Sequence, residues 1–220
     1  MTIPGLFNTG VDDSGAPLAA GAADNHYKLI ASDDPLFPVP PHPPATPPIG
    51  IPSKVTDSPL PGTWTANTGV PSASQWISPN AQQTPQDNNL PVGNAAGTYI
   101  YELTVDLTGL NPQTVSISGL WAVDNIGLID LNVGTPGGGY IPGTTNHGGA
   151  SGYTPFTIPA GSPFVAGLNK IDFVVITGAA GPTGMHVDNL AGIPEPSSVA
   201  LATIGGVGLL AMQYRRRRRK

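Results

Sequence analysis

Carboxylates are the main reactive side chains of this 220-residue chain, which has no cysteine. Glycoside hydrolysis needs two carboxyl groups on one cleft, and here aspartates would have to supply them. Glu102 is the one glutamate before residue 193, and we expect it on a solvated strand surface. Asp12-Asp13 and Asp33-Asp34 are adjacent pairs, and adjacent residues of a strand point to opposite faces. Because the chain also lacks Gly-x-Ser-x-Gly and His-Glu-x-x-His patterns, we expect no enzyme; an aspartate hydrolase is the alternative.

Oxygen ligands for a hard cation occur near the N-terminus. Asp12, Asp13, Asp24 and Asn25 are close in sequence and would converge if this segment wraps the body. They predict a structural calcium site, with turn formation and capping as the alternative role. The four histidines lack metal-ligand spacing and are expected at surface or core positions: His26, His42, His147 and His186.

Aromatic residues are the candidates for stacking on a sugar. Trp121 alternates with apolar neighbours, so we expect it in the core, and we expect Trp76 to be packed as well. Trp64 is a candidate by residue type only. Tyr140 and Tyr153 flank a Gly-rich loop at 134–152 and would form a platform there, although no ligand-binding pair is assigned.

Charge excludes one class of partner. Residues 1–193 hold three basic and thirteen acidic residues, a net charge of −10. Phosphate backbones are bound by clustered Lys and Arg, so we expect no nucleic acid partner.

The body reads as an all-β domain. Gly and Pro, 29 and 26 residues, make a quarter of the chain and disfavour helices, yet 39% of residues are hydrophobic. Alternating stretches predict strands at 98–107, 115–123, 127–133, 156–158, 169–176 and 184–190. Short strands between turns predict a β-sandwich. Residues 35–62 hold eleven prolines and predict a loop of polyproline character that cannot be a central strand.

The C-terminal region has three parts in order. Pro194, Glu195 and Pro196 come first, and an uncharged stretch of eighteen residues, 197–214, follows. As a helix that stretch would be about 27 Å long, close to the thickness needed for one membrane span. The basic residues after it would stay cytoplasmic: Arg215, Arg216, Arg217, Arg218, Arg219 and Lys220.

This order of motif, span and basic tail resembles the PEP-CTERM sorting signal. The resemblance implies recognition by an exosortase, transient anchoring in the inner membrane, and processing near Pro194–Pro196 on the way to the cell surface. It also implies an association with exopolysaccharide. An exported substrate needs a leader, and 1–7 offers neither a basic nor an apolar region, so we expect a leader encoded upstream of Met1.

Residues 5–192 resemble a looser module of planctomycete-type surface proteins. The similar stretches include Asn8–Asp12, Asp24–Tyr27, Ser74–Ile77, the Leu131-Asn132 step and Phe164–Asn169. This resemblance implies a jelly roll like the galactose-binding domain, in which a structural calcium is common.

Two domains are therefore expected: a sandwich at 1–192 and a sorting signal with one transmembrane helix at 193–220. The expected function is that of an exported, non-catalytic surface or matrix protein with a role in binding polysaccharide. A matrix component that binds no ligand is the third hypothesis.

Overall fold

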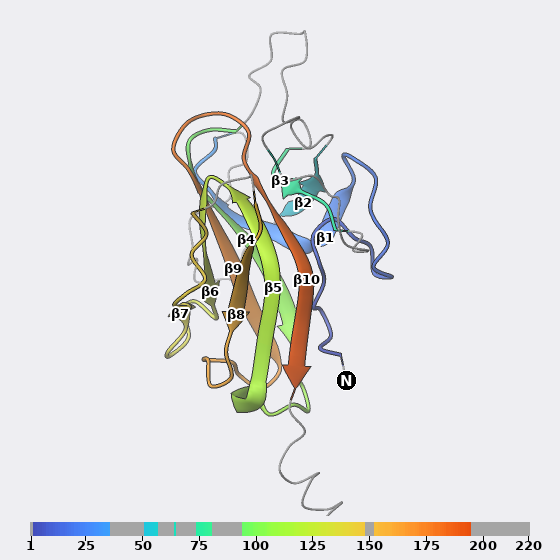
Figure 1. Ribbon diagram of the computed structural model, residues 1–220, viewed down its shortest axis with the longest axis vertical. Coiled ribbons are helices and arrows are strands. Elements are labelled where there is room, and N and C mark those ends of the chain that lie inside the picture. The colour runs from blue at the N-terminus through green and yellow to red at the C-terminus, as the bar shows by residue number, and fades with distance from the viewer. Residues whose placement is uncertain are drawn as a thin grey trace, which may run out of the picture.

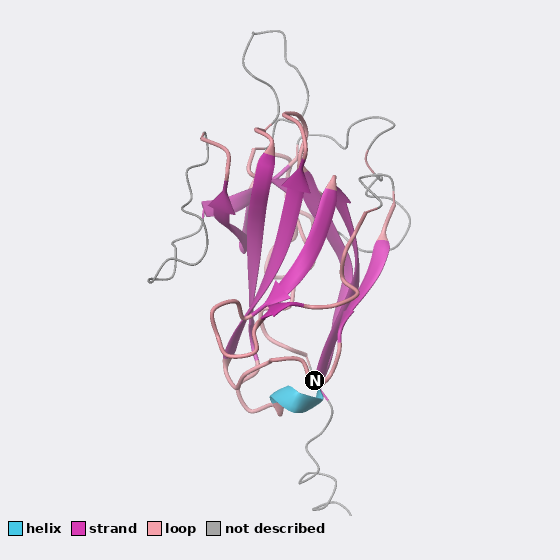
Figure 2. Ribbon diagram, turned by 90° about the vertical axis from the view of Figure 1, so that its left-hand side faces the viewer, coloured by secondary structure: helices cyan, strands magenta, loops and turns pink. Residues whose placement is uncertain are grey.

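The computed structural model describes residues 2–35, 51–56, 64, 74–80, 94–147 and 152–194. All strand pairs are antiparallel and join into one ten-stranded sheet, which folds over to make two layers (Figures 1 and 2). One short 3₁₀ helix, η1 (Pro112–Thr114), precedes β5. The all-β prediction is confirmed, and the two layers make a β-sandwich.

Five strands form the first layer. They are β7 (Gly139–Tyr140), β6 (Ile126–Leu131), β9 (Leu168–Thr177), β4 (Gly97–Asp106) and β1 (Ala23–Ser32), in that spatial order. β4 and β9 pair over ten residues without a break, which makes this pair the longest regular ladder of the layer.

The second layer consists of β10 (Gly184–Pro194), β5 (Val115–Asp124) and β8 (Thr154–Ile158). β2 (Ile51–Val55) and β3 (Ile77–Ser78) connect β1 of the first layer to β10 of the second. β10 continues through Pro194, which pairs with Val115, so this strand extends two residues beyond the boundary expected at 192.

The core lies between the layers and is rich in aromatic rings. Trp121 of β5 and Phe156 of β8 both meet Phe173 of β9, with ring centroids 5.8 and 6.0 Å apart. Trp121 and Trp76 have no exposed surface, so the prediction that both are packed is confirmed.

The prediction for residues 35–62 is wrong in part. β2 lies within this range and occupies an interior position of the sheet, between β1 and β3. The proline of this strand, Pro52, pairs opposite Lys28, next to the break in register between Asp24 and Lys28 of β1. Proline has no N–H to donate, and a bulge is one of the few places where a sheet accepts that loss.

The N-terminal segment packs beside β10. Thr9 donates its N–H to the Val187 carbonyl at 3.1 Å and accepts the Val187 N–H on its hydroxyl at 3.0 Å. The Asn8 side chain accepts the Leu190 N–H at 2.9 Å. The start of the chain therefore satisfies donors on β10.

The sorting motif falls mostly outside the described residues. The backbone of Pro194 ends β10, whereas Glu195, Pro196, the 197–214 stretch and the basic tail are not described. Within the described ranges, no helix is long and apolar enough to cross a membrane.

Candidate functional site

Tyr140 presents the most exposed aromatic ring among the described residues, with 48% of its surface accessible. It ends the two-residue strand β7, which pairs with the end of β6 through Asp130. The phenol group hydrogen-bonds to the Thr145 hydroxyl at 2.8 Å. The ring is thus held at its edge while much of its surface faces solvent.

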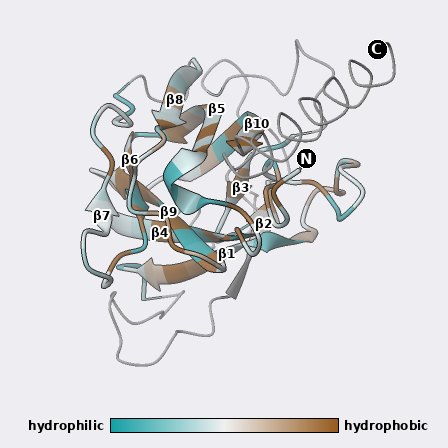
Figure 3. Ribbon diagram, turned by 90° about the horizontal axis from the view of Figure 1, so that it is seen from below, coloured by the Kyte–Doolittle hydropathy of each residue, from teal (hydrophilic) through white to brown (hydrophobic). Residues whose placement is uncertain are grey.

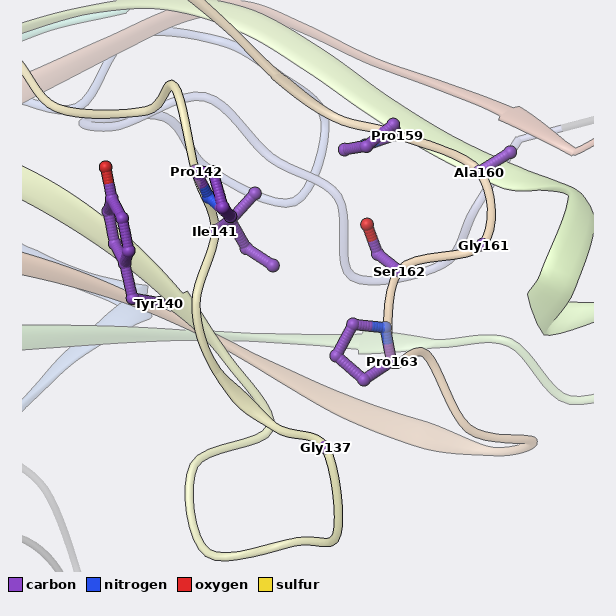
Figure 4. Close-up of a pocket in the computed structure, with 9 residues that line it drawn as sticks. All are labelled: Gly137, Tyr140, Ile141, Pro142, Pro159, Ala160, Gly161, Ser162 and Pro163. Carbon is purple, nitrogen blue, oxygen red and sulfur yellow. The ribbon is translucent and has the colours of Figure 1, made fainter.

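A second wall stands opposite this ring. The loop from Pro159 to Pro163, between β8 and β9, lines an open pocket of about 370 Å³ together with Gly137 and the Tyr140–Pro142 segment. Figure 4 shows Pro159, Ser162 and Pro163 on one side and Tyr140, Ile141 and Pro142 on the other. The lining carries hydroxyl groups and apolar surface but no carboxylate and no ammonium group.

Two buried asparagines position this second wall. The Asn132 amide donates to the Pro163 carbonyl at 2.9 Å and to the Asn169 side chain at 2.8 Å. Asn169 in turn donates to the carbonyls of Val165 and Gly167, both at 2.8 Å. These residues come from the Leu131-Asn132 step and the Phe164–Asn169 stretch of the module resemblance, so the two motifs meet behind the pocket.

The pocket suits binding better than bond cleavage. A sugar ring stacks on an aromatic face and hydrogen-bonds to neighbouring hydroxyls and carbonyls, and sites for small ligands are usually concave with few polar groups. General acid–base catalysis needs a titratable group near neutral pH at the reacting atoms. The lining of this pocket has no carboxylate, imidazole or ammonium group.

The four predicted calcium ligands are brought near one another, but the carboxylate of Asp24 is engaged by backbone N–H groups. Asp12, Asp13 and Asn25 line a small pocket of about 120 Å³. Asp24 is buried, and its carboxylate accepts the N–H groups of Gly10 and His26 at 2.7 and 2.9 Å. Among the residues that the structure describes, no three His, Asp or Glu side chains are grouped to hold a metal ion. Calcium stays a prediction.

His26 occupies the centre of this N-terminal cluster. Its ring stacks on Phe7 with centroids 3.8 Å apart, and its nitrogens lie 3.0 Å from Asp13 and 3.3 Å from Asp24. Hydrogen bonding to Asp24 is the main cause that raises the pKa of His26, and Asp13 adds to it. The cluster therefore favours an imidazolium that links the N-terminal segment to β1.

A second cluster, which the sequence did not reveal, surrounds His186 of β10. The Trp64 and Trp76 rings stack 4.3 Å apart, and Trp76 lies 5.7 Å from the imidazole. His186 Nδ1 is 2.9 Å from the Tyr153 hydroxyl, and Nε2 is 2.8 Å from the Ser74 hydroxyl. Burial lowers the pKa of His186 to about 4, so the ring is neutral at pH 7.

This hydroxyl–imidazole–hydroxyl chain has the spacing of a nucleophile with its base. A substrate could not reach these groups, because Ser74 and His186 are only 3% and 1% exposed. These two hydrogen bonds instead satisfy buried polar groups and connect the 74–80 segment to β10. Tyr153 belongs to this cluster and not to the Tyr140 pocket, so the two tyrosines expected at one platform lie at different sites.

A row of charged residues crosses the outer face of the first layer. Lys28 pairs opposite Glu102, Glu102 opposite Asp172, and Asp172 opposite Asp130. The expectation of a solvated Glu102 is wrong: it is 8% exposed and forms an ion pair with Lys170 at 2.9 Å. Burial, with Glu102 as the next cause, raises the pKa of Asp172 to about 7.

No family model matches the sequence, and no curated protein matches it. Among solved structures, the carbohydrate-binding module TmCBM61, in complex with β-1,4-galactotriose, is similar over 46% of this chain and 67% of its own. The identity is 14% and the TM-score 0.32. Two cyclases from Fischerella sp. TAU, each in complex with an indole compound, are similar over 86% of this chain and 98% of theirs. Their identities are 11% and 13%, with TM-scores of 0.42 and 0.39. Scores this low bear on neither substrate nor activity.

Proposed function

We propose that this chain is an exported, non-catalytic surface protein whose sandwich binds polysaccharide through the Tyr140 pocket. Its C-terminal segment is proposed to be read by an exosortase at Pro194–Pro196 and to anchor the protein in the inner membrane before processing. The finer assignment of the sandwich to the galactose-binding jelly rolls, and the location at the cell surface or in the matrix, belong to the same proposal.

One observation carries the binding part: the exposed Tyr140 ring borders an open, uncharged pocket of about 370 Å³. Neutral sugars offer an apolar ring face and many hydroxyls, and this lining matches both features. The net charge of −10 over residues 1–193 favours a neutral polysaccharide over an anionic one, because like charges repel.

The binding part is tested by titrating the purified protein with exopolysaccharide from the host and with a panel of neutral oligosaccharides. We expect Tyr140→Ala to lose binding and Tyr140→Phe to keep it, because the ring face makes the contact. Ile176→Ala is a matched control, since this residue is exposed but lies outside the pocket. Binding that survives Tyr140→Ala would place the ligand elsewhere, and no binding to any glycan would favour a ligand-free matrix component.

The sorting part is tested by mass spectrometry of the mature protein from its host. We expect a C-terminus near Pro194–Pro196 and no peptide from the basic tail at 215–220. Replacement of Glu195 by Ala should leave an unprocessed, membrane-bound form. An intact basic tail on the mature wild-type protein would overturn this part while leaving the Tyr140 site untouched.

A further inference from the structure

One end of the sandwich, here called the base, is formed by residues 2–6, 107–115, 159–168 and 190–193. Backbone hydrogen bonds join these segments: Asp106 donates to Pro4, Leu107 to Gly167 and Gly161 to Gln113, at 2.9, 2.8 and 3.0 Å. The start of the chain and the arrowhead of β10 lie at this end in Figure 1, and η1 lies beside the start of the chain in Figure 2. Figure 3 looks onto this end from below. The base is therefore a continuous surface.

The base carries little charge for a strongly acidic body, with one carboxylate, that of Asp106, at its edge. Its four segments contain no Asp, Glu, Lys or Arg, although residues 1–193 hold sixteen charged residues. Asp106 adjoins the second segment and pairs opposite Leu168, so it is the one charged residue beside them at this point. Asp33, Asp34 and Asp124 lie instead at the opposite end, where β1 and β5 finish. The opposite end of the sandwich therefore carries more negative charge than the base.

Apolar side chains are exposed on this base. Leu168, Ile193 and Val165 are 68%, 62% and 42% accessible, which makes them three of the six exposed large hydrophobic residues in the described part of the chain. An apolar crevice of about 250 Å³ lies beside them, between Ile3 and Leu6 on one side and Leu190 to Gly192 on the other. Isolated exposed hydrophobic residues are ordinary, but a group on one surface with little charge marks an interaction site.

The short distance in sequence between β10 and the proposed membrane span indicates which partner this surface contacts. β10 is paired with β5 as far as Pro194, and the uncharged stretch expected to enter the membrane begins at Ser197. Three residues reach at most about 10 Å when fully extended. If 197–214 spans the bilayer, the base cannot be farther than this from the headgroups.

We infer that the base docks on the bilayer surface while the protein is anchored, with Val165, Leu168 and Ile193 at the boundary between headgroups and acyl chains. Apolar side chains bind at that boundary, whereas carboxylates would be repelled by anionic lipid. The inference rests on the proposed membrane span at 197–214. Docking holds the Pro194–Pro196 motif at the membrane surface, where a membrane-embedded sorting enzyme works, and leaves the acidic end facing away.

Single-cysteine labelling tests this orientation, because the chain has no native cysteine. Full-length Leu168→Cys and Val165→Cys variants carry an environment-sensitive fluorophore and are reconstituted in vesicles of phosphatidylethanolamine and phosphatidylglycerol. Ala180→Cys, exposed in the loop between β9 and β10 at the opposite end, is the matched control. Alkaline carbonate extraction reports separately whether the chain is inserted.

We expect an inserted protein whose base labels emit at shorter wavelength and are quenched by iodide several-fold less than the Ala180 label. Adding Leu168→Glu to the Val165-labelled protein should restore quenching, because a carboxylate is repelled from the headgroups. An inserted protein with base labels quenched as strongly as the Ala180 label would overturn the docking and leave the anchor in place. A protein that carbonate extracts would overturn the proposed span, and the docking with it.

Discussion

Asp172 combines burial with an unpaired oxygen. The side chain is 2% exposed, and Oδ1 has no hydrogen-bond partner. Its pKa rises from 3.8 to about 7, first because burial penalises the charged form and then because Glu102 is close. Between these two values the folded protein holds a proton that the unfolded chain has released. The free energy of unfolding therefore falls as pH rises through this window.

Asp172→Asn should consequently stabilise the protein at pH 8, by about 2 kcal/mol, because it removes a buried carboxylate that has no paired cation of its own. The gain should shrink toward zero near pH 4, where the native Asp172 is protonated. Urea unfolding at several pH values measures the difference between variant and native protein. Asp106→Asn is the control and should give no gain, since hydrogen bonds from Thr108 lower the pKa of Asp106. A gain for Asp172→Asn that does not depend on pH would contradict this assignment.

For His186 we expect the free energy of unfolding to change with pH in the opposite direction. Burial lowers its pKa from 6.5 to about 4. Between these values the unfolded chain takes up a proton that the folded protein refuses, so this residue makes the free energy of unfolding rise with pH. His186→Gln should lose stability at pH 7, because the bonds to Ser74 and Tyr153 are broken, by about 1–3 kcal/mol. The loss should narrow as pH falls from 6.5 to 4.

The His186 prediction is tested by measuring the melting temperatures of His186→Gln and of the native protein across this pH range and comparing them at each pH. His147→Gln, at an exposed position, is the matched control and should follow the native pH dependence. A penalty for His186→Gln that stays constant from pH 7 to pH 4 would show that burial does not hold this ring neutral.

At the scale of elements, the packing of β5 on β6 depends on a glycine. A Cβ at Gly127 would lie 2.5 Å from Cη2 of the fully buried Trp121, closer than real contacts allow. Gly127→Ala should therefore displace the indole and cost about 1–3 kcal/mol, the usual penalty for overpacking a core. Gly178→Ala is the control, because a Cβ at that position would have no atom within 4 Å. Equal melting temperatures for the two variants would contradict this packing role.

Strands were predictable where apolar and polar residues alternate. The stretch expected at 98–107 is β4, and that expected at 169–176 is β9, because one face of each strand is buried in the core. β2 was not predictable, since its proline argues against a strand unless the bulge in the partner strand is known. β7 has only two residues, too few for any alternation, and lies inside a Gly-rich loop where no strand was expected.

Of the candidate site, only the aromatic residue Tyr140 was predictable from the sequence. Tyr140 stood out by residue type, but the opposite wall depends on Asn132 contacting Asn169, 37 positions later. The His186 cluster depends on Ser74, 112 positions away. Contacts at such separations follow from the strand order, and periodicity in one stretch of sequence does not contain them.

At the scale of the whole molecule, the two ends of the described chain form one unit. Val187 of β10 donates to the Thr9 hydroxyl across 178 positions, and Leu190 donates to Asn8 across 182. Thr9 also accepts the Gln75 N–H at 2.8 Å, so the N-terminal segment lies between β10 and the segment that leads into β3. Closing the sandwich therefore needs its first residues.

Deleting residues 2–20 should therefore abolish cooperative unfolding. The deletion leaves buried N–H donors of β10 without partners, and each such group costs about 1–3 kcal/mol, a large share of the stability of a small domain. It also removes Ile3 and Leu6 from the crevice beside Leu190. A chain ending at Pro194 keeps every one of these contacts and should unfold in a single transition. Calorimetry and limited proteolysis of the two truncations compare them directly. A deletion of 2–20 that melts as sharply as the chain ending at Pro194 would show that β10 is held by β5 and β3 alone, and that the N-terminal segment only covers a strand already in place.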